Sequence, residues 1–211
     1  MERSVKLRDE KVGKLLLEFS IPAIIGMLVN SLYIVIDRIF IGRVVGAMAI
    51  SGVSLTFPIS ILIMAFGMLV GIGAAARISI RLGENNKDEA EHILGNAFVL
   101  LIIVSIVITI LGLIFVDPML RGFGASDNTI GYAKQFITIL ISVSIFQTVG
   151  FGLNNVIRSE GDPKTAMNTM LIGGICNIIL DFLFIYILHF GIRGAAIATS
   201  ISQGINMIWV L

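Results

Sequence analysis

Long runs without charged residues alternate along the chain with short polar connections. Each run is continuously apolar over roughly 20 residues, which is the length that an α-helix needs to cross a bilayer, whereas the strands of a membrane barrel alternate in polarity over about 10 residues. The pattern therefore predicts membrane-spanning helices. We expect six of them, at residues 15–40, 53–77, 91–116, 130–157, 165–189 and 192–211.

The connections between the runs are less sharply defined. The run Val44–Ala76 is longer than a bilayer requires, and its first part, Val44–Gly52, is small and glycine-rich, so we expect a connecting loop there. The first run has no small-residue cleavage site, which indicates an uncleaved span rather than a signal peptide. We therefore divide the chain into a cytoplasmic segment, residues 1–14, and a six-helix transmembrane lobe, residues 15–211.

The composition is that of a membrane protein. Hydrophobic residues make up 56% of the chain and charged residues 14%, against about 25% charged residues in soluble domains. These fractions exclude a disordered chain and an ordinary soluble enzyme, and the single cysteine, Cys176, excludes a disulfide scaffold. The net charge is +1, and no basic stripe points to nucleic acid as a partner. The apolar composition predicts membrane lipid as the surroundings of the chain.

The lysines and arginines predict the orientation in the membrane. Ten of the 15 fall on the side of the two termini and five on the opposite side. Because basic residues are enriched in cytoplasmic loops, we expect both termini in the cytoplasm.

Two aspartates lie within the apolar runs. An aspartate at the bilayer centre costs about 2.5–3.5 kcal/mol on insertion scales and is by default a candidate functional residue. Asp37 comes five residues before Gly42, near the outer end of its helix, and Asp181 comes eight residues before His189. At about 1.5 Å per residue, both carboxylates belong in the outer half of the membrane.

Helical spacing gives the two aspartates polar neighbours on four helices. These neighbours recur at intervals of three, four or seven residues, so those of one helix share a face. They are Asn30 and Tyr33 in the first helix, Gln147 and Asn154 in the fourth, Asn177 in the fifth, and Thr199, Gln203 and Asn206 in the sixth. Such side chains also serve simply to hydrogen-bond helices together, and this alternative stays open for Asn30, Gln203 and Asn206.

Two carboxylates with amide and hydroxyl oxygens suit a hard monovalent cation such as sodium, or a proton shared between the acids. Asp37 has an alternative role as an interfacial partner of Arg38 or Arg43. Metal-assisted hydrolysis has no support, because the chain lacks an HExxH motif. The GxGD pattern of intramembrane aspartyl proteases and the GxSxG serine elbow are absent too.

Short segments along the whole chain resemble the multidrug and toxic compound extrusion (MATE) transporters, in particular the bacterial branch with the DNA-damage-inducible and staphylococcal multidrug types. No single segment decides the match, but seven occur in order. They are Phe19-Ser-Ile-Pro22, Ile36-Asp-Arg-Ile-Phe-Ile-Gly42, Gly71-Ile-Gly-Ala-Ala75, Arg81-Leu-Gly83, Arg158-Ser-Glu-Gly-Asp162, Asn177-xxx-Asp181 and Gly194-Ala-Ala-Ile-Ala-Thr199.

The resemblance implies the amino-terminal six-helix lobe of a twelve-helix antiporter of the bacterial inner membrane, which exports organic cations against sodium or protons. It implies no cofactor apart from the coupling ion, sodium or a proton. The carboxy-terminal lobe of the same protein would be the partner of this lobe. The family's cation site would fall on four residues, with two more lining the same pocket: Asp37, Asn177, Asp181 and Thr199, then Tyr33 and Asn154.

Three functions are open at this point. The first is a lobe of a cation-coupled efflux antiporter that exports lipophilic organic cations or drugs by alternating access. The second is a flippase for a lipid-linked precursor, disfavoured because no lysine or arginine falls deep in a span. The third, an intramembrane hydrolase, lacks its motifs. Alternating access needs two bundles and the chain stops within its sixth span, at Trp209-Val-Leu211, so we expect half of a longer transporter.

Overall fold

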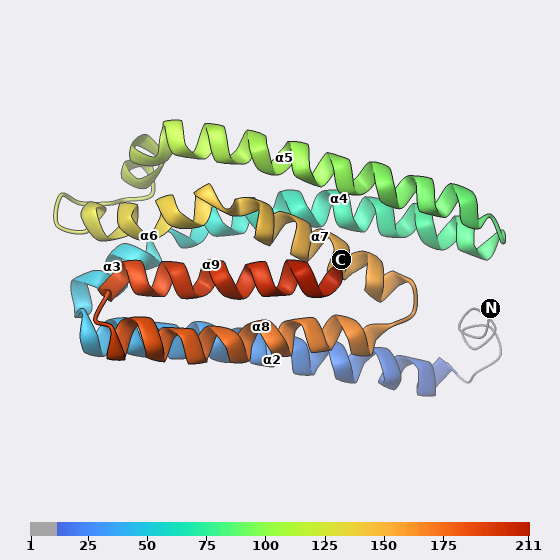
Figure 1. Ribbon diagram of the computed structural model, residues 1–211, viewed down its shortest axis with the longest axis horizontal. Helices are drawn as coiled ribbons and strands as arrows, with labels where there is room; N and C mark the ends of the chain where they lie inside the picture. The colour runs from blue at the N-terminus through green and yellow to red at the C-terminus, as the bar shows by residue number, and fades with distance from the viewer. Residues whose placement is uncertain (1–11) are drawn as a thin grey trace.

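The computed structural model describes residues 12–211, and this part of the chain is helical apart from short connections. The long helices run along one axis, and the start of α2 and the end of α9 lie towards the same end of it (Figure 1). The elements are α2 Val12–Val44, α3 Ala47–Ser54, α4 Phe57–Gly83, α5 Lys87–Gly122, α6 Ile130–Ser142, α7 Ser144–Ser159, α8 Pro163–Asp181, the π-helical turn η1 Phe182–Ile187, and α9 Gly191–Val210.

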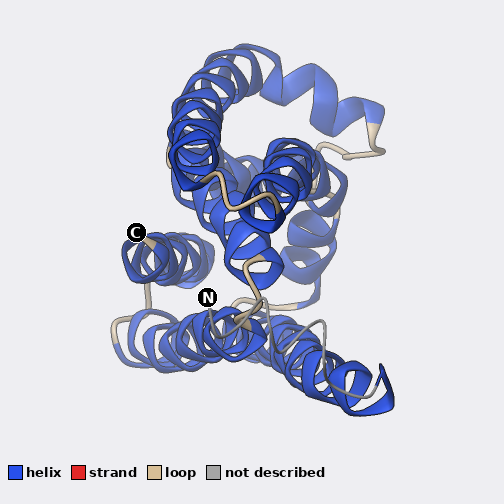
Figure 2. Ribbon diagram, turned by 90° about the vertical axis from the view of Figure 1, so that its right-hand side faces the viewer, coloured by secondary structure: helices blue, strands red, loops and turns tan. Residues whose placement is uncertain are grey.

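The helices form two layers with α9 beside both. In one layer α2 packs along α8, and in the other α4, α5, α6 and α7 pack on one another. α9 packs against α8 of the first layer and against α6 and α7 of the second. The separation of the layers is plain when the molecule is viewed along its long axis (Figure 2). Residues on the inner faces of α2, α8 and α9 therefore face the second layer.

The all-helical membrane fold is confirmed. Four stretches of the described chain are long and apolar enough to cross a membrane: Val12–Val44, Ala47–Gly83, Lys87–Gly122 and Pro163–Ile187. α6 and α7 make a fifth if this bent pair is counted as one span. α9 has 20 residues but is not in this set, because its polar side chains lower its hydropathy.

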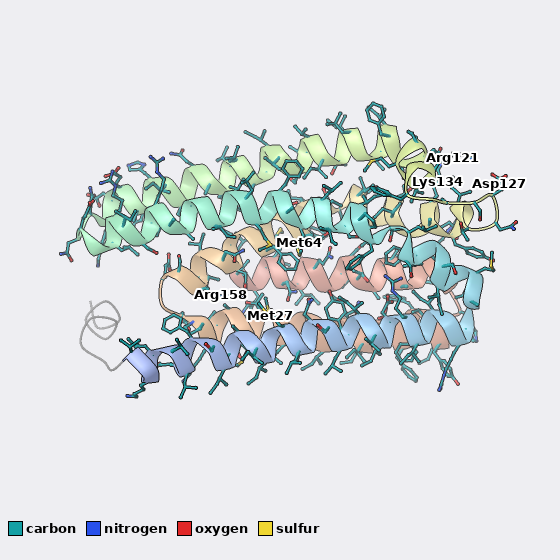
Figure 3. All side chains as sticks on the ribbon, turned by 180° about the vertical axis from the view of Figure 1, so that it is seen from behind. Met27, Met64, Arg121, Asp127, Lys134 and Arg158 are labelled. Atoms are coloured by element: carbon teal, nitrogen blue, oxygen red, sulfur yellow. The ribbon has the colours of Figure 1, made fainter. Side chains whose placement is uncertain are left out.

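Charged side chains gather at the two ends of the bundle. Arg121, Asp127 and Lys134 lie together at the end where α5 gives way to α6, and Arg158 lies towards the other end (Figure 3). Lys134 forms an ion pair with Asp117 over 2.7 Å. The apolar length between these ends is what a bilayer would cover.

Two predicted segments differ from the structure. The stretch Val44–Gly52, expected as a loop, contains most of α3. Gly52 lets this short helix lie against the start of α6, since a Cβ there would come within 2.8 Å of the Thr129 carbonyl oxygen. The expected segment 1–14 is divided: residues 1–11 lie outside the described part, whereas 12–14 already belong to α2.

The helix expected at 130–157 is broken into two. α6 and α7 meet at Val143 with a bend of 59°. Hydroxyl groups of α5 and α7 hydrogen-bond at this break: Thr109 donates to the Ile141 carbonyl over 3.0 Å, and its oxygen lies 2.9 Å from that of Ser144. These contacts satisfy polar groups that a broken helix exposes to lipid.

Glycines allow α4 and α7 to approach closely. A Cβ on Gly67 would come within 2.8 Å of the Thr148 carbonyl oxygen, and one on Gly71 within 2.5 Å of that of Gly152. The small-residue stripe of α4 is therefore a backbone-to-backbone packing surface. This close packing positions α7, which carries residues of the candidate site.

Candidate functional site

Asp37 lies on the inner face of α2 and is 6% exposed. Its Oδ1 has no hydrogen-bond partner in the described part of the chain, and it forms no ion pair there with Arg38 or Arg43. The Arg38 guanidinium nevertheless interacts electrostatically with the Asp37 carboxylate.

Asp181 is the last residue of α8 and is fully buried. Neither of its carboxylate oxygens has a hydrogen-bond partner among residues 12–211. The six residues that follow it are π-helical, a conformation that is rare and is found mostly at functional sites. No pattern in the sequence predicted this turn.

Three helices bring the four predicted cation-site residues together. The carboxyl groups of Asp37 and Asp181 are close enough to interact electrostatically, and Tyr33 interacts with both. Asn177 reaches across from α8 to α9, where its Nδ2 donates to Thr199 Oγ1 over 3.4 Å. The Oδ1 of Asn177 has no hydrogen-bond partner within the described chain.

The donor atoms of this site fit a hard cation or a proton. Buried oxygens without partners cost free energy unless a ligand or a proton satisfies them. Asp37, Asn177 and Asp181 each have such an oxygen, and Thr199 adds a hydroxyl. No group of three or more histidines, cysteines and acids that could hold a metal ion occurs in residues 12–211. The oxygen set therefore favours sodium or a proton over a transition metal.

Two cavities adjoin the site and share a wall. The smaller cavity, of about 50 Å³, lies between α2, α7, α8 and α9, and is lined by Asn154 and Asn177 among others. The larger cleft, of about 270 Å³, lies between α2, α4, α6, α7 and α9, and is lined by Asp37. Met64, on α4, borders this larger cleft (Figure 3). Six residues line both cavities: Asn30, Tyr33, Gln147, Phe151, Thr199 and Gln203.

The polar residues of the fourth predicted span form hydrogen bonds to neighbouring helices. Asn154 donates from Nδ2 to the Ala166 carbonyl near the start of α8 over 3.0 Å, and accepts from Arg158 over 3.4 Å. Gln147 donates to the Ser60 carbonyl of α4 over 3.5 Å. Both residues face cavities, but their amide groups also tie α7 to α8 and to α4.

The polar residues of α9 include hydrogen-bond acceptors without a partner in the described part of the chain. The side-chain carbonyl oxygens of Gln203 and Asn206 are buried and have no hydrogen-bond partner in the described part. Both residues line the smaller cavity. Their carbonyl oxygens therefore do not act as helix-to-helix hydrogen-bond acceptors.

One residue of the larger cleft was missed from the sequence. Arg38 lines the cleft, and its guanidinium carbon lies 6.0 Å from the centre of the Phe136 ring. Arg38 lies six residues before the end of α2 at Val44, so its guanidinium faces the cleft from near that end of the helix. Its side chain packs on an aromatic ring of α6. In the sequence, only its place directly after Asp37 pointed to this position.

The family model described as MatE matches residues 22–183. The chain belongs to the MatE family. The resemblance to multidrug and toxic compound extrusion transporters is thereby confirmed. Members of this family are transporters and not enzymes, so the hypothesis of an intramembrane hydrolase is wrong.

Individual relatives agree with this membership. A multidrug export protein MepA from Staphylococcus haemolyticus is 31% identical over 204 residues, which are 97% of this chain and 45% of the relative. An outward-facing multidrug resistance MATE transporter is 32% identical, with a TM-score of 0.88 over 98% of this chain and 46% of its own. A MATE structure in complex with MaD3S is also 32% identical, with a TM-score of 0.89 and the same coverage. The chain thus spans about half the length of the relatives that it matches.

Proposed function

We propose that this MatE lobe is the amino-terminal half of a multidrug efflux antiporter, which exports lipophilic organic cations by alternating access and is driven by sodium or protons. Two buried carboxylates carry this proposal: within residues 12–211, Oδ1 of Asp37 and both oxygens of Asp181 lack a hydrogen-bond partner. An unpaired carboxylate is expensive inside a membrane, so its natural role there is to bind a cation or a proton. Asn177 and Thr199 complete the binding set in this proposal.

The cation acts by favouring one conformation over another. A bound cation drives transport only if it binds the two conformations with different affinity. The carboxylates lie on α2 and α8, which form one layer, and the larger cleft lies between α2 and the other layer. Neutralising Asp37 changes the charge of the cleft wall and so changes the affinity for a cationic substrate. Both termini face the cytoplasm in this proposal, and the lobe alone inserts but does not transport.

The test is ethidium efflux by the full-length transporter in cells or everted membrane vesicles. We expect efflux against a concentration gradient that depends on an imposed sodium or proton gradient. Replacing sodium by potassium at constant pH, and then collapsing the pH gradient at constant sodium, distinguishes the two ions. Efflux that depends on neither ion contradicts the proposal.

A flippase for lipid-linked precursors is the second candidate, and Arg38 is the observation that favours it. Its guanidinium lines the larger cleft, where a phosphate could approach it. A flippase would not export ethidium under any gradient, so the same experiment separates the two functions.

A further inference from the structure

A third cavity, of about 620 Å³, lies between α4 and α5, and among the described residues it shares no lining residue with the two cavities of the candidate site. Its floor is formed by the buried side chains of Ile59, Ile63 and Ile141, and its rims by exposed apolar side chains such as Leu62 and Val107. We call it the α4–α5 groove. Its volume is that of a site for a whole small ligand, about 300–1,000 Å³.

The α4–α5 groove is long and follows α5. Near the connection between the two helices (Figure 1), buried alanines of both, among them Ala75 and Ala97, pack in one cluster. Further from this connection, the groove follows α5 from Ile103 to Met119, a rise of about 24 Å at about 1.5 Å per residue. One leaflet contributes about 15 Å of hydrocarbon to a bilayer. The groove is therefore long enough for an acyl chain to lie along it through its own leaflet.

The α4–α5 groove and the larger cleft lie on opposite faces of α4. Leu62 and Phe66 line the groove, whereas Ser60 and Met64 line the larger cleft. Two positions along a helix correspond to a rotation of about 200°. Alternating access requires the second lobe to meet the first around the central site, which is the cleft side of α4. The groove on the other side then faces lipid.

A charged residue stands at the end of the groove. Arg121 comes two positions after the groove residue Met119, and its side chain is 61% exposed. Its ion pair with Asp127 joins two exposed groups over 3.4 Å, and pairs of this kind contribute little to stability. A guanidinium binds phosphate through parallel hydrogen bonds. An apolar groove with an accessible guanidinium at its end matches the acyl chain and the phosphate of a phospholipid.

We propose that the α4–α5 groove binds one phospholipid of the leaflet at this end of the bundle, with an acyl chain along the groove and the phosphate at Arg121. This site goes beyond the proposed export function, because it is separate from the cation site and from the larger cleft. The acyl chain lies on Ile141, whose carbonyl oxygen accepts from Thr109 beside the bend of α6 and α7. The bound lipid therefore packs against the break between these helices.

Protection of a cysteine tests where the lipid binds. In the delipidated full-length transporter without other cysteines, Val107→Cys should react with N-ethylmaleimide. Phosphatidylglycerol at about ten times its dissociation constant should slow this reaction by about tenfold, since only the unoccupied fraction reacts. Ile110→Cys is the matched control. Val107 and Ile110 are 48% and 53% exposed on the same helix, but Ile110 does not line the groove, so the lipid should leave its rate unchanged.

Arg121→Gln tests the phosphate subsite, with affinities measured from the same protection of Val107→Cys. It should weaken the binding of phosphatidylglycerol by about tenfold, since one charge-assisted pair is lost. Binding of a diacylglycerol with the same acyl chains should not change, because this lipid has no phosphate. Asp127→Asn removes the carboxylate that competes for Arg121, so phosphatidylglycerol should bind it as tightly as before or more tightly.

Three results would overturn the inference. If Val107→Cys fails to react after delipidation, the second lobe covers the groove. Equal protection of both cysteines would mean that lipid coats the apolar surface without preference for the groove. Unchanged affinity for phosphatidylglycerol in Arg121→Gln would contradict the phosphate subsite. These measurements use neither an ion gradient nor a drug, so ethidium efflux still tests the proposed function by itself.

Discussion

Asn177 and Thr199 join α8 to α9 at the candidate cation site, where the amide Nδ2 of Asn177 donates to the Thr199 hydroxyl over 3.4 Å. This contact directs the amide nitrogen towards Thr199 and leaves Asn177 Oδ1 unpartnered within residues 12–211. The hydrogen bond thereby makes an oxygen available for a cation next to Asp181, which lies one helical turn further along α8.

Thr199→Val tests that relationship. Valine has nearly the shape of threonine but lacks the oxygen, so Asn177 loses its acceptor and the cation loses a ligand. We expect the half-saturating concentration of the driving cation to rise by up to about tenfold, as the loss of one hydrogen bond implies. Cation-dependent ethidium efflux by the full-length transporter is the measurement. Thr138→Val, on α6 and outside both cavities, is the control and should leave the concentration unchanged.

Asp181→Asn should abolish cation-driven export without unfolding the protein. Asparagine keeps the volume of aspartate but removes the charge, so gradient-driven efflux in vesicles should fall by about tenfold or more. The melting temperature should not fall, because a buried charge without a partner is removed. Asp37→Asn should act in the same direction.

Asp127→Asn is the control for the aspartate variants. Its side chain is 90% exposed and lies 3.4 Å from Arg121, so its charge is of little consequence for stability or export. Normal gradient-driven export by Asp181→Asn would show that the proposed cation site is wrong.

Gly71→Ala should destabilise the lobe. The added methyl group would lie 2.5 Å from the Gly152 carbonyl oxygen and 2.7 Å from its Cα, so α4 and α7 must separate. Overpacking of this kind costs about 1–3 kcal/mol. Gly73→Ala, two residues away on the same helix, meets no atom within 4 Å and should be neutral or stabilising. Thermal melting of the purified transporter compares the two; equal melting temperatures would contradict the packing described here.

Cysteine labelling tests the orientation. In a transporter freed of Cys176 and other native cysteines, an impermeant thiol reagent added outside should label cysteines placed at Gly46 and Ser126. Cysteines at Asn86 and Ser159 should react only after the membrane is opened. The charge bias of 10 basic residues against five predicts this pattern, and labelling in the reverse order would contradict the placement of the termini in the cytoplasm.

The sequence was sufficient for most of the helical stretches, and it named individual residues as candidates for the site. Continuous apolar length has one structural solution in lipid, which is why the helical stretches could be placed from composition alone. Asp37 and Asp181 stood out for the same reason, since ionised groups in apolar runs are expensive.

What depended on tertiary contacts could not be predicted. The bend at Val143 has no proline or glycine beside it, and the hydroxyls that satisfy it include Thr109 on another helix. α3 forms where Gly52 meets the start of α6. Arg38 and Phe136, about 100 residues apart in the chain, line the same cleft and lie 6.0 Å apart, from the guanidinium carbon to the ring centre.

The wall between the two cavities has a consequence for how large a substrate the lobe can hold. Its side chains belong to both spaces, so a side chain of this wall that moves to widen one space narrows the other. A bulky substrate that displaces Tyr33 or Phe151 drives those rings towards the smaller space, whose 50 Å³ holds only a few water molecules. A bulky substrate in the larger cleft and the water molecules that hydrate a cation in the smaller cavity then compete for the same volume. The substrate and the cation would exclude each other without being in contact.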